Sequence, residues 1–301
     1  MRLKLSTLMI PERDAARAGT LPVEEGVIVS QENVPWQIQL FRKSLKKRIK
    51  WGILEGLLPS GLNGQIRCLD LGCAKGTFSY LLKARGGTWV SADLDFPNLE
   101  AAKALVGPSV CRLDYRTFPF ADQSMDMIVS LDFLEHVQED DLCLQEFRRI
   151  LKPGGTLVLS TPGTGKMYLA NRLRRLAGLT LEDYGHVREG YTLFDLAGRL
   201  RALGFVVSHE STYSRFFTEV LEMAMNAYYA RKARRQESSR PRDGGISPGS
   251  EADFKAIGGM MKIYSFVYPV LWGISRLDSL LAFTSGYALM IAAVKGREAG
   301  A

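Results

Sequence analysis

The chain has 301 residues, of which 46% are hydrophobic and 24% are charged, and its formal net charge at pH 7 is +7. These proportions are those of a globular protein with a large core, and they exclude a disordered or fibrous chain. The positive charge permits binding to nucleic acid or to an anionic membrane surface but requires neither. Four cysteines without a C-x-x-C pair predict buried free thiols in a reducing cytosol, and no metal site.

Residues 1–35 mix charge, glycine and proline without periodicity, which predicts a flexible N-terminal arm without a secretory signal. From residue 36, apolar side chains recur every three or four positions and lysines and arginines occupy the other faces. This pattern predicts a basic amphipathic helix that caps the core and exposes its basic face to solvent. A membrane-surface role or a substrate-phosphate role for the same face stays open.

The chain is organised around residues 66–82. An apolar strand over 66–71 is followed by a glycine turn and then by a helix that begins at Thr77. The glycines let the backbone approach a ligand closely. The N-terminal end of the following helix, which carries a partial positive charge, would then point toward that ligand. Asp70 at the strand end would repel a phosphate and suits a ligand that carries an ammonium group. Ala74 and Thr77 stand where a dinucleotide-binding motif needs glycine, and no lysine follows Gly76 as a phosphate loop requires.

The pattern D-x-G-C-x-x-G from Asp70 to Gly76 resembles the first motif of class I S-adenosylmethionine-dependent methyltransferases, which is usually D-x-G-C-G-x-G. Ala74 is the departure from that pattern, and we expect it to narrow the room around the methionine moiety. The resemblance implies that Asp70 and the turn, with Gly72, Cys73, Ala74 and Gly76, bind the methionine end of S-adenosyl-L-methionine.

Two further predicted strands also end in carboxylates. The strand over 88–93 ends in Asp93, about twenty residues after the turn, where a ribose would present its hydroxyls. Asp95 is the alternative if the register differs. Asp114 and Tyr115 follow a third strand over 109–113, and Asp114 is the candidate ligand of the adenine amino group. The resemblance also implies that Leu94 packs on the adenine and that Leu131 borders the cofactor.

Residues 126–136 and 151–160 resemble the next segments of the same superfamily, in the same order and at the usual spacing. Alternating strands and helices predict an α/β fold with a Rossmann-like seven-stranded sheet, mostly parallel with an antiparallel last strand. We expect the core to span residues 36–212 and the terminal strand and tail to span 286–301. Between them, residues 213–285 predict a helical lid insertion that contains a flexible linker over 231–252.

Three histidines are the candidates for a general base. His186 lies in a Gly-His-Val-Arg-x-x-Tyr-Thr segment that resembles the substrate-side loop of methyltransferases of the ubiquinone-biosynthesis-like (type 11) group, with Tyr184 and Tyr191 nearby. It is therefore the first candidate for a base or a substrate-orienting group. His136 is the second candidate, and the family mostly uses that position for packing. His209 lies in a predicted strand and reads as structural.

The sequence therefore predicts a methyltransferase that acts on a small or lipid-linked acceptor, with oxygen as the favoured acceptor atom. The aromatic residues of the lid favour a quinone precursor, a lipid-linked glycan or a lipid. We expect a cytoplasmic protein that does not span a membrane, because Pro269, Arg276 and Asp278 interrupt the apolar run over 263–294. The aromatic helices are expected to pack as a lid, and a peripheral contact with the inner face of the membrane stays open. The alternatives are an RNA methyltransferase, against which the lack of an RNA-binding module argues, and a catalytically inactive membrane-peripheral scaffold.

Overall fold

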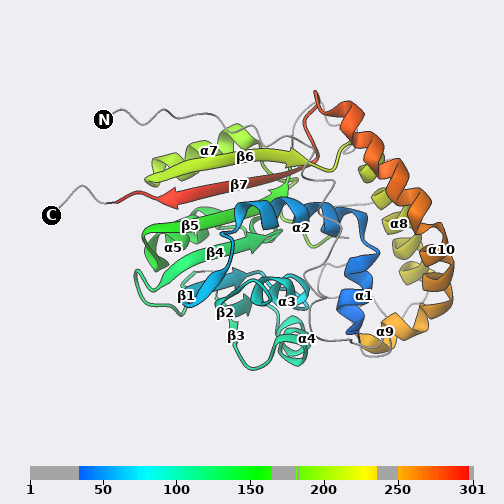
Figure 1. Cartoon of the computed structure of the whole chain (residues 1–301), viewed down its shortest axis with the longest axis horizontal. Coiled ribbons are helices and arrows are strands. Elements are labelled where there is room, and N and C mark those ends of the chain that lie inside the picture. Colours follow the sequence, from blue (N-terminus) through cyan, green and yellow to red (C-terminus); the bar gives the residue numbers. More distant parts are fainter. Residues whose placement is uncertain (1–33, 115, 165–180, 182–183, 236–249, 298–301) are drawn as a thin grey trace.

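The computed structural model describes residues 34–114, 116–164, 181, 184–235 and 250–297. The predicted N-terminal arm, most of the predicted linker and the last residues of the tail lie outside the described residues. The described chain forms a layered α/β core with a set of additional helices at one end (Figure 1).

Seven strands form one sheet in the order β3-β2-β1-β4-β5-β7-β6. Strands β1 to β5 pair in parallel, whereas β7 runs antiparallel to both of its neighbours. The predicted fold class, a mostly parallel sheet with an antiparallel last strand, is confirmed. The strands are β1 (Leu62–Leu71), β2 (Gly86–Asp93), β3 (Val110–Arg112), β4 (Met125–Leu131), β5 (Leu151–Pro162), β6 (Phe205–Tyr213) and β7 (Ala288–Lys295).

Helices cover both faces of the sheet because successive side chains of a strand point to opposite sides. On β4, Ile128 packs in a cluster with residues of α5 and α7, whereas Met127 and Val129 pack in another with residues of α2 and α3. The covering elements are α2 (Leu45–Leu57), α3 (Thr77–Lys83), α4 (Phe96–Val106), the short η3 (Leu134–His136), α5 (Asp140–Ile150) and α7 (Leu193–Ala202).

The single basic helix predicted from residue 36 is two helices, α1 (Trp36–Arg42) and α2. The helix is interrupted at Ser44, the N-cap of α2, whose hydroxyl accepts a hydrogen bond from the backbone N–H of Lys47 at 3.3 Å. A serine that caps a helix in this way competes with continuation of the preceding helix. The periodicity continued through the break, so the sequence pattern alone did not reveal it.

Four further elements lie between β6 and β7: α8 (Phe216–Arg235), α9 (Glu251–Ala256), α10 (Gly258–Ser275) and η5 (Arg276–Leu281). They stand beyond the carboxyl ends of the parallel strands (Figure 1). The buried carboxylate of Asp278 accepts backbone N–H bonds from Arg215 and Phe217 at 2.8 Å each, so η5 is tied to the start of α8. Within the described part of the chain, no helix combines the length and hydropathy that membrane spanning requires.

Candidate active site

A cavity of about 620 Å³ lies at the carboxyl ends of the parallel strands. Its floor comes from β1, β2 and β4, and its walls come from α1, α2, α8 and α10. The predicted site residues that line it are Asp70, Gly72, Cys73, Ala74, Asp93, Leu94, Leu131, His136, Tyr184 and His186. The cavity therefore joins the predicted cofactor residues to the predicted acceptor residues.

The glycine turn after β1 depends on two positions where a side chain would not fit. Gly72 has φ 80°, and an added Cβ would lie 2.9 Å from the Cβ of Phe133. Gly76 has φ 81° at the start of α3, and a Cβ there would lie 2.9 Å from the Cα of Ala102. Ala74 adopts φ 44° between them, a left-handed conformation that favours glycine. The backbone of the turn therefore packs closely against Phe133 and Ala102, where a side chain on Gly72 or Gly76 would not fit.

Asp70 ends β1 in a buried position below the turn. Its carboxylate accepts a hydrogen bond from the Ser79 hydroxyl on α3. Burial raises the pKa of Asp70 to about 7, although the Ser79 hydrogen bond opposes that shift. Asp70 makes no ion pair with any described residue, and a buried carboxyl group in that situation favours a ligand that brings a positive charge.

Asp93 ends β2 and connects the second strand to the turn. One carboxylate oxygen accepts the backbone N–H of Ala74 at 2.7 Å, and the other accepts the backbone N–H of Asp95 at 3.0 Å. Burial raises the pKa of Asp93, while these backbone bonds lower it. The side chain of Asp95, the register alternative, caps α4 by accepting the N–H of Asn98. Asn98 itself lines the cavity and was not identified from the sequence.

The predicted adenine ligand lies apart from these residues. Asp114 is exposed, accepts the backbone N–H of Arg116 at 2.9 Å and is absent from the cavity wall. Tyr115 lies outside the described residues. An adenine contact at Asp114 therefore stays a prediction.

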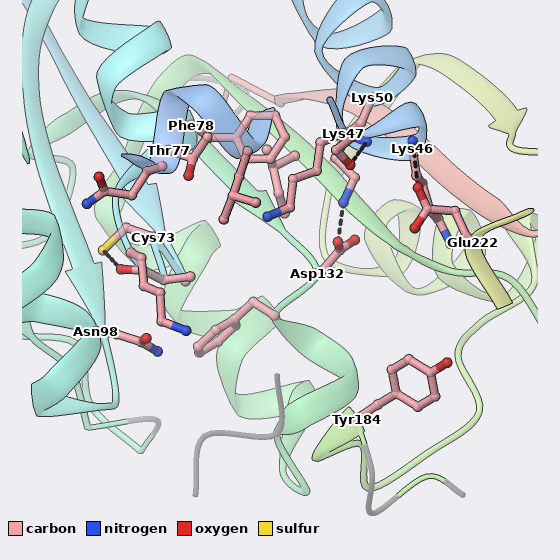
Figure 2. Close-up of a pocket in the computed structure, with 18 of the residues that line it drawn as sticks. Lys46, Lys47, Lys50, Cys73, Thr77, Phe78, Asn98, Asp132, Tyr184 and Glu222 are labelled. Carbon is pink, nitrogen blue, oxygen red and sulfur yellow. Dashed lines mark hydrogen bonds and ion pairs between the residues drawn. The ribbon is translucent and has the colours of Figure 1, made fainter. Parts of the chain in front are cut away.

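Lysines of α2 form a wall that sequence reasoning assigned to solvent. Lys50 is 3% exposed, and its ammonium group pairs with the carboxylate of Asp132 (Figure 2). Burial would raise the pKa of Asp132, but the charge of Lys50 lowers it below its usual value. Lys46 and Lys47 line the same cavity. The expectation of a solvated basic face was therefore wrong for Lys50, which is buried, whereas Lys46 and Lys47 are half-buried in the cavity wall.

Two of the three lysines on this wall, Lys46 and Lys50, form ion pairs with described residues, and Lys47 does not. The ammonium group of Lys46 lies 2.7 Å from a carboxylate oxygen of Glu219 on α8. Lys47 makes no ion pair with any described residue, and burial, followed by repulsion from Lys50, lowers its pKa. Glu222 also faces this wall and accepts the backbone N–H of Lys46 at 3.2 Å. Glu219, Glu222 and Asn226 therefore give α8 a polar side toward the cavity, beside the apolar Met223.

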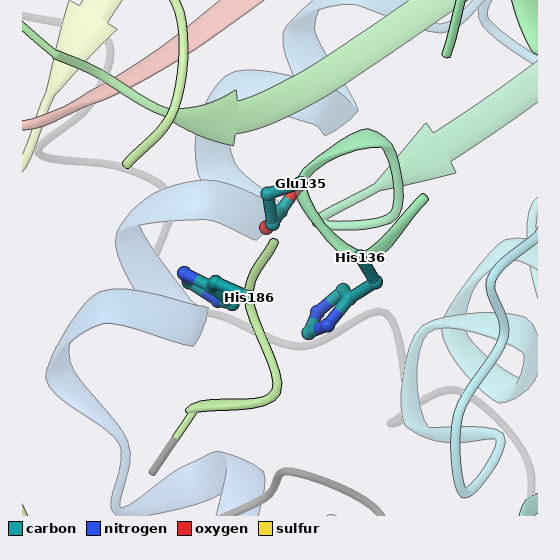
Figure 3. A group of neighbouring side chains, drawn as sticks. All are labelled: Glu135, His136 and His186. Carbon is teal, nitrogen blue, oxygen red and sulfur yellow. The ribbon is translucent and has the colours of Figure 1, made fainter. Parts of the chain in front are cut away.

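Glu135, His136 and His186 form a compact group in the cavity wall (Figure 3). One potential ligand atom from each lies within 4.8 Å of the others. Glu135 is fully buried, with one oxygen on Thr161 at 3.1 Å and the other without a partner among the described residues. Burial, followed by the charge of Asp132, raises the pKa of Glu135 to about 8. The group can exchange protons, and its donor atoms also suit a divalent cation. The prediction of no metal site rested on the cysteines alone.

The two predicted tyrosines separate in the structure. Tyr184 lines the cavity, and its ring centroid lies 5.5 Å from that of His186. Tyr191 is 4% exposed, donates its hydroxyl hydrogen to Asp140 and does not line the cavity. Arg188 and Arg199 both pair with the same carboxylate of Asp140, so Tyr191 belongs to a buried network. That network holds the loop that carries His186.

Sequence comparisons connect this site to characterised proteins. The methyltransferase domain family model matches residues 69–159. The ubiquinone biosynthesis O-methyltransferase of Brucella melitensis is 32% identical over 108 residues, which cover 34% of this chain and 43% of that protein. The biotin biosynthesis bifunctional protein BioHC of Cellvibrio japonicus is 30% identical over 173 residues, 55% of this chain and 33% of that protein. The chain thus spans less than half the length of these curated relatives.

A structural comparison supports the same fold. Phosphoethanolamine N-methyltransferase 2 of Haemonchus contortus, solved with phosphomonomethylethanolamine and S-adenosylhomocysteine, superposes with a TM-score of 0.52 at 18% sequence identity. The superposition covers 82% of this chain and 52% of that structure, and at this identity it shows the fold alone. Residues 69–159 therefore match a methyltransferase domain, and the sheet and the glycine turn after β1 agree with the fold that the resemblance to class I S-adenosylmethionine-dependent methyltransferases implies.

Proposed function

We propose that the protein transfers the methyl group of S-adenosyl-L-methionine to an oxygen atom of a small or lipid-linked acceptor. One observation carries the proposal: a single cavity runs from Asp70 and Asp93 to His186 and the lysines of α2. A cofactor at one end and an acceptor at the other would share that space. The reaction needs such an arrangement because the acceptor oxygen, the methyl carbon and the sulfur must lie in line.

The cofactor end supplies recognition. Asp70 would bind the ammonium group of the methionine moiety, beside the backbone of Cys73 and Ala74. Asp93 would accept the ribose hydroxyls, since each of its oxygens has one backbone N–H partner and a carboxylate offers about four acceptor positions in all. Leu94 and Asn98 follow Asp93 on the cavity wall and would border the adenine.

The acceptor end supplies a base and a positive charge. When bound, the cofactor supplies a methyl group on a positively charged sulfur, and a C–O bond forms as the C–S bond breaks. His186 would take the proton from the acceptor hydroxyl, while Lys47 would stabilise the oxygen anion. Lys47, which makes no ion pair with any described residue, would in its protonated form favour an acidic hydroxyl over an amine that carries its own positive charge. The Brucella relative named for O-methylation is consistent with this choice.

The mixed character of the cavity suggests how an apolar acceptor would sit. Glu219, Glu222 and Asn226 would contact the polar reacting head. Met223 on α8 and Met261 on α10 give the same cavity an apolar side, where the first part of a lipid tail would pack. A phenolic or quinol head with an apolar tail fits this division better than an entirely polar acceptor.

The test has two stages. Calorimetric titration of the full chain with S-adenosylmethionine and its demethylated product should give micromolar binding that is lost in Asp93→Ala. Methyl transfer from labelled cofactor is then measured to a catechol, to the same catechol with a prenyl tail and to the corresponding aminophenol. Transfer to oxygen supports the proposal. Transfer to nitrogen alone would overturn the choice of acceptor atom, and a folded chain that binds no cofactor would overturn the activity.

A further inference from the structure

We infer that the outer face of α10 and η5 is a docking surface for an anionic lipid bilayer. The outer face is defined here as the exposed side chains between residues 262 and 283. The helix α10 packs on α8 and forms the outermost layer at one end of the molecule (Figure 1). The inference concerns where the protein binds, so it does not depend on the proposed methyl transfer.

The outer face is apolar along its whole length. Phe266 and Phe283 are 86% and 85% exposed, and Ile263, Val270 and Leu280 are each 65–70% exposed. Ile263, Phe266 and Val270 recur at three- or four-residue steps in α10, so they project from one side of that helix. Leu280 on η5 and Phe283 just after η5 extend the exposed apolar residues beyond α10. Isolated exposed hydrophobic residues are ordinary, but a continuous stripe of this length marks a contact surface.

The charges on the outer face have a single sign. Residues 257–285 contain three charged side chains, Lys262, Arg276 and Asp278. Asp278 is only 8% exposed and is engaged by the backbone of α8, as described above. Lys262 and Arg276 are exposed and make no ion pair with any described residue. A hydrophobic stripe with basic residues and no exposed carboxylate complements the acyl chains and negative headgroups of an anionic membrane.

A second copy of the chain fits this surface less well. Two such faces packed antiparallel about a two-fold axis near residue 269 would bring Lys262 of one copy opposite Arg276 of the other. Other registers would leave both cations facing apolar residues, because the face has no carboxylate to receive them. Burying unpaired cations is costly, whereas lipid phosphates would pair with them.

The opposite side of α10 contributes to the cavity. Met261 and Tyr264 line it, and the Tyr264 hydroxyl donates a hydrogen bond to the carbonyl oxygen of Lys43 at 2.8 Å. The helix therefore separates the proposed bilayer surface from the cavity. An acceptor anchored in that bilayer would need to pass only one helix to reach the site.

Flotation of the full chain with vesicles tests the inference without cofactor or acceptor. Wild type should float with vesicles of phosphatidylcholine that contain 30% phosphatidylglycerol, more weakly with phosphatidylcholine alone, and less at high salt. Phe266→Ser/Phe283→Ser should lower the partition coefficient at least about 10-fold, since both side chains lose apolar contact. Lys262→Gln/Arg276→Gln should remove most of the preference for anionic vesicles.

The matched control is Phe194→Ser, which replaces an aromatic side chain that is 89% exposed on α7, a helix outside the proposed surface. It should float like wild type. Because Phe194, Phe266 and Phe283 are almost fully exposed, the substitutions should leave the melting temperature unchanged. Equal loss of flotation in Phe194→Ser would overturn the inference. The inference would also be overturned if wild type did not float with vesicles but formed dimers in sedimentation, and if replacing Phe266 and Phe283 abolished those dimers. The outer face would then be an interface with a second copy.

Discussion

The carboxylate of Asp93, at the end of β2, accepts a hydrogen bond from the backbone N–H of Ala74 across 2.7 Å. This bond ties the second strand to the glycine turn that follows the first. Asp93 would thus do two things: hold the turn in place and present its remaining acceptor positions to the cavity. The Asp93 side chain therefore links the part of the proposed site that would hold the ribose to the turn that would hold the methionine moiety.

Asp93→Ala should weaken S-adenosylmethionine binding at least about 30-fold, because it removes a charged hydrogen-bond acceptor worth roughly 2 kcal/mol or more. Titration calorimetry measures the loss. Asp122→Ala is the control, since Asp122 is an exposed carboxylate that pairs with Arg149 outside the cavity. If both variants bound the cofactor as wild type does, the ribose role of Asp93 would be refuted.

Gly76→Ala should destabilise the protein more than Gly154→Ala. The two glycines have nearly the same φ, 81° and 80°, but a Cβ at Gly76 would lie 2.9 Å from Ala102, whereas Gly154 has nothing within 4 Å. Both variants therefore incur strain of about 1–2 kcal/mol from the left-handed backbone. Gly76→Ala should incur roughly 1–3 kcal/mol more from the clash. Thermal unfolding compares them, and equal melting temperatures would mean that α4 moves aside freely.

The residues at the strand ends were predictable, while those on the helices were not. Asp70 and Asp93 directly follow apolar strands, and parallel strands bring their carboxyl ends to one edge of the sheet. For α2, the periodicity shows which residues share a face but not what packs against it. Glu219, about 170 residues later in the sequence, forms an ion pair with Lys46, and no local sequence pattern indicates that contact. Likewise, Tyr184 lines the cavity and Tyr191 does not, because the Tyr191 hydroxyl donates a hydrogen bond to Asp140 at the start of α5.

Cofactor affinity should rise with pH. The pKa of Asp70 in the free protein is about 7, so the group is mostly protonated at pH 5.5 and mostly ionised at pH 7.5. The cofactor's ammonium group is still mostly charged at pH 7.5 and favours the ionised form. Affinity should therefore increase roughly 10- to 25-fold from pH 5.5 to 7.5. Asp70→Asn should bind weakly with a flat profile; a flat profile in wild type would show that Asp70 does not titrate against the ligand.

Glu135 should make the free protein less stable at alkaline pH. Its pKa rises from about 4.5 in the unfolded chain to about 8 in the fold, so the folded state holds the extra proton between these values. Stability contributed by that proton is present at low pH and is lost as the pH rises through about 8. Glu135→Gln should remove this loss, raising the melting temperature relative to wild type at pH 8.5 more than at pH 6. The same difference at both pH values would contradict the assignment.

His186→Asn should lower kcat by more than about 10²-fold and leave cofactor affinity within about 2-fold of wild type. His209→Asn, on β6 and outside the cavity, should change neither. If a divalent cation bound by Glu135, His136 and His186 supports the reaction instead, a chelator should inactivate wild type and His136→Asn should match His186→Asn. Loss of cofactor binding together with turnover would point to a folding role for His186.

Lys47→Met should lower kcat/KM for a hydroxyl acceptor by roughly 10- to 100-fold, because the variant removes the amino group that is proposed, in its protonated form, to stabilise the oxygen anion. The rise of kcat/KM with pH should also move to higher pH, since an acceptor hydroxyl beside Lys47 ionises more readily than one beside methionine. Lys47→Arg keeps the charge and should retain the wild-type pH profile. Lys103→Met, exposed on α4, is the matched control. A lower kcat/KM with an unchanged pH profile would make Lys47 a packing residue of the cavity wall and would remove the main electrostatic argument for an oxygen acceptor.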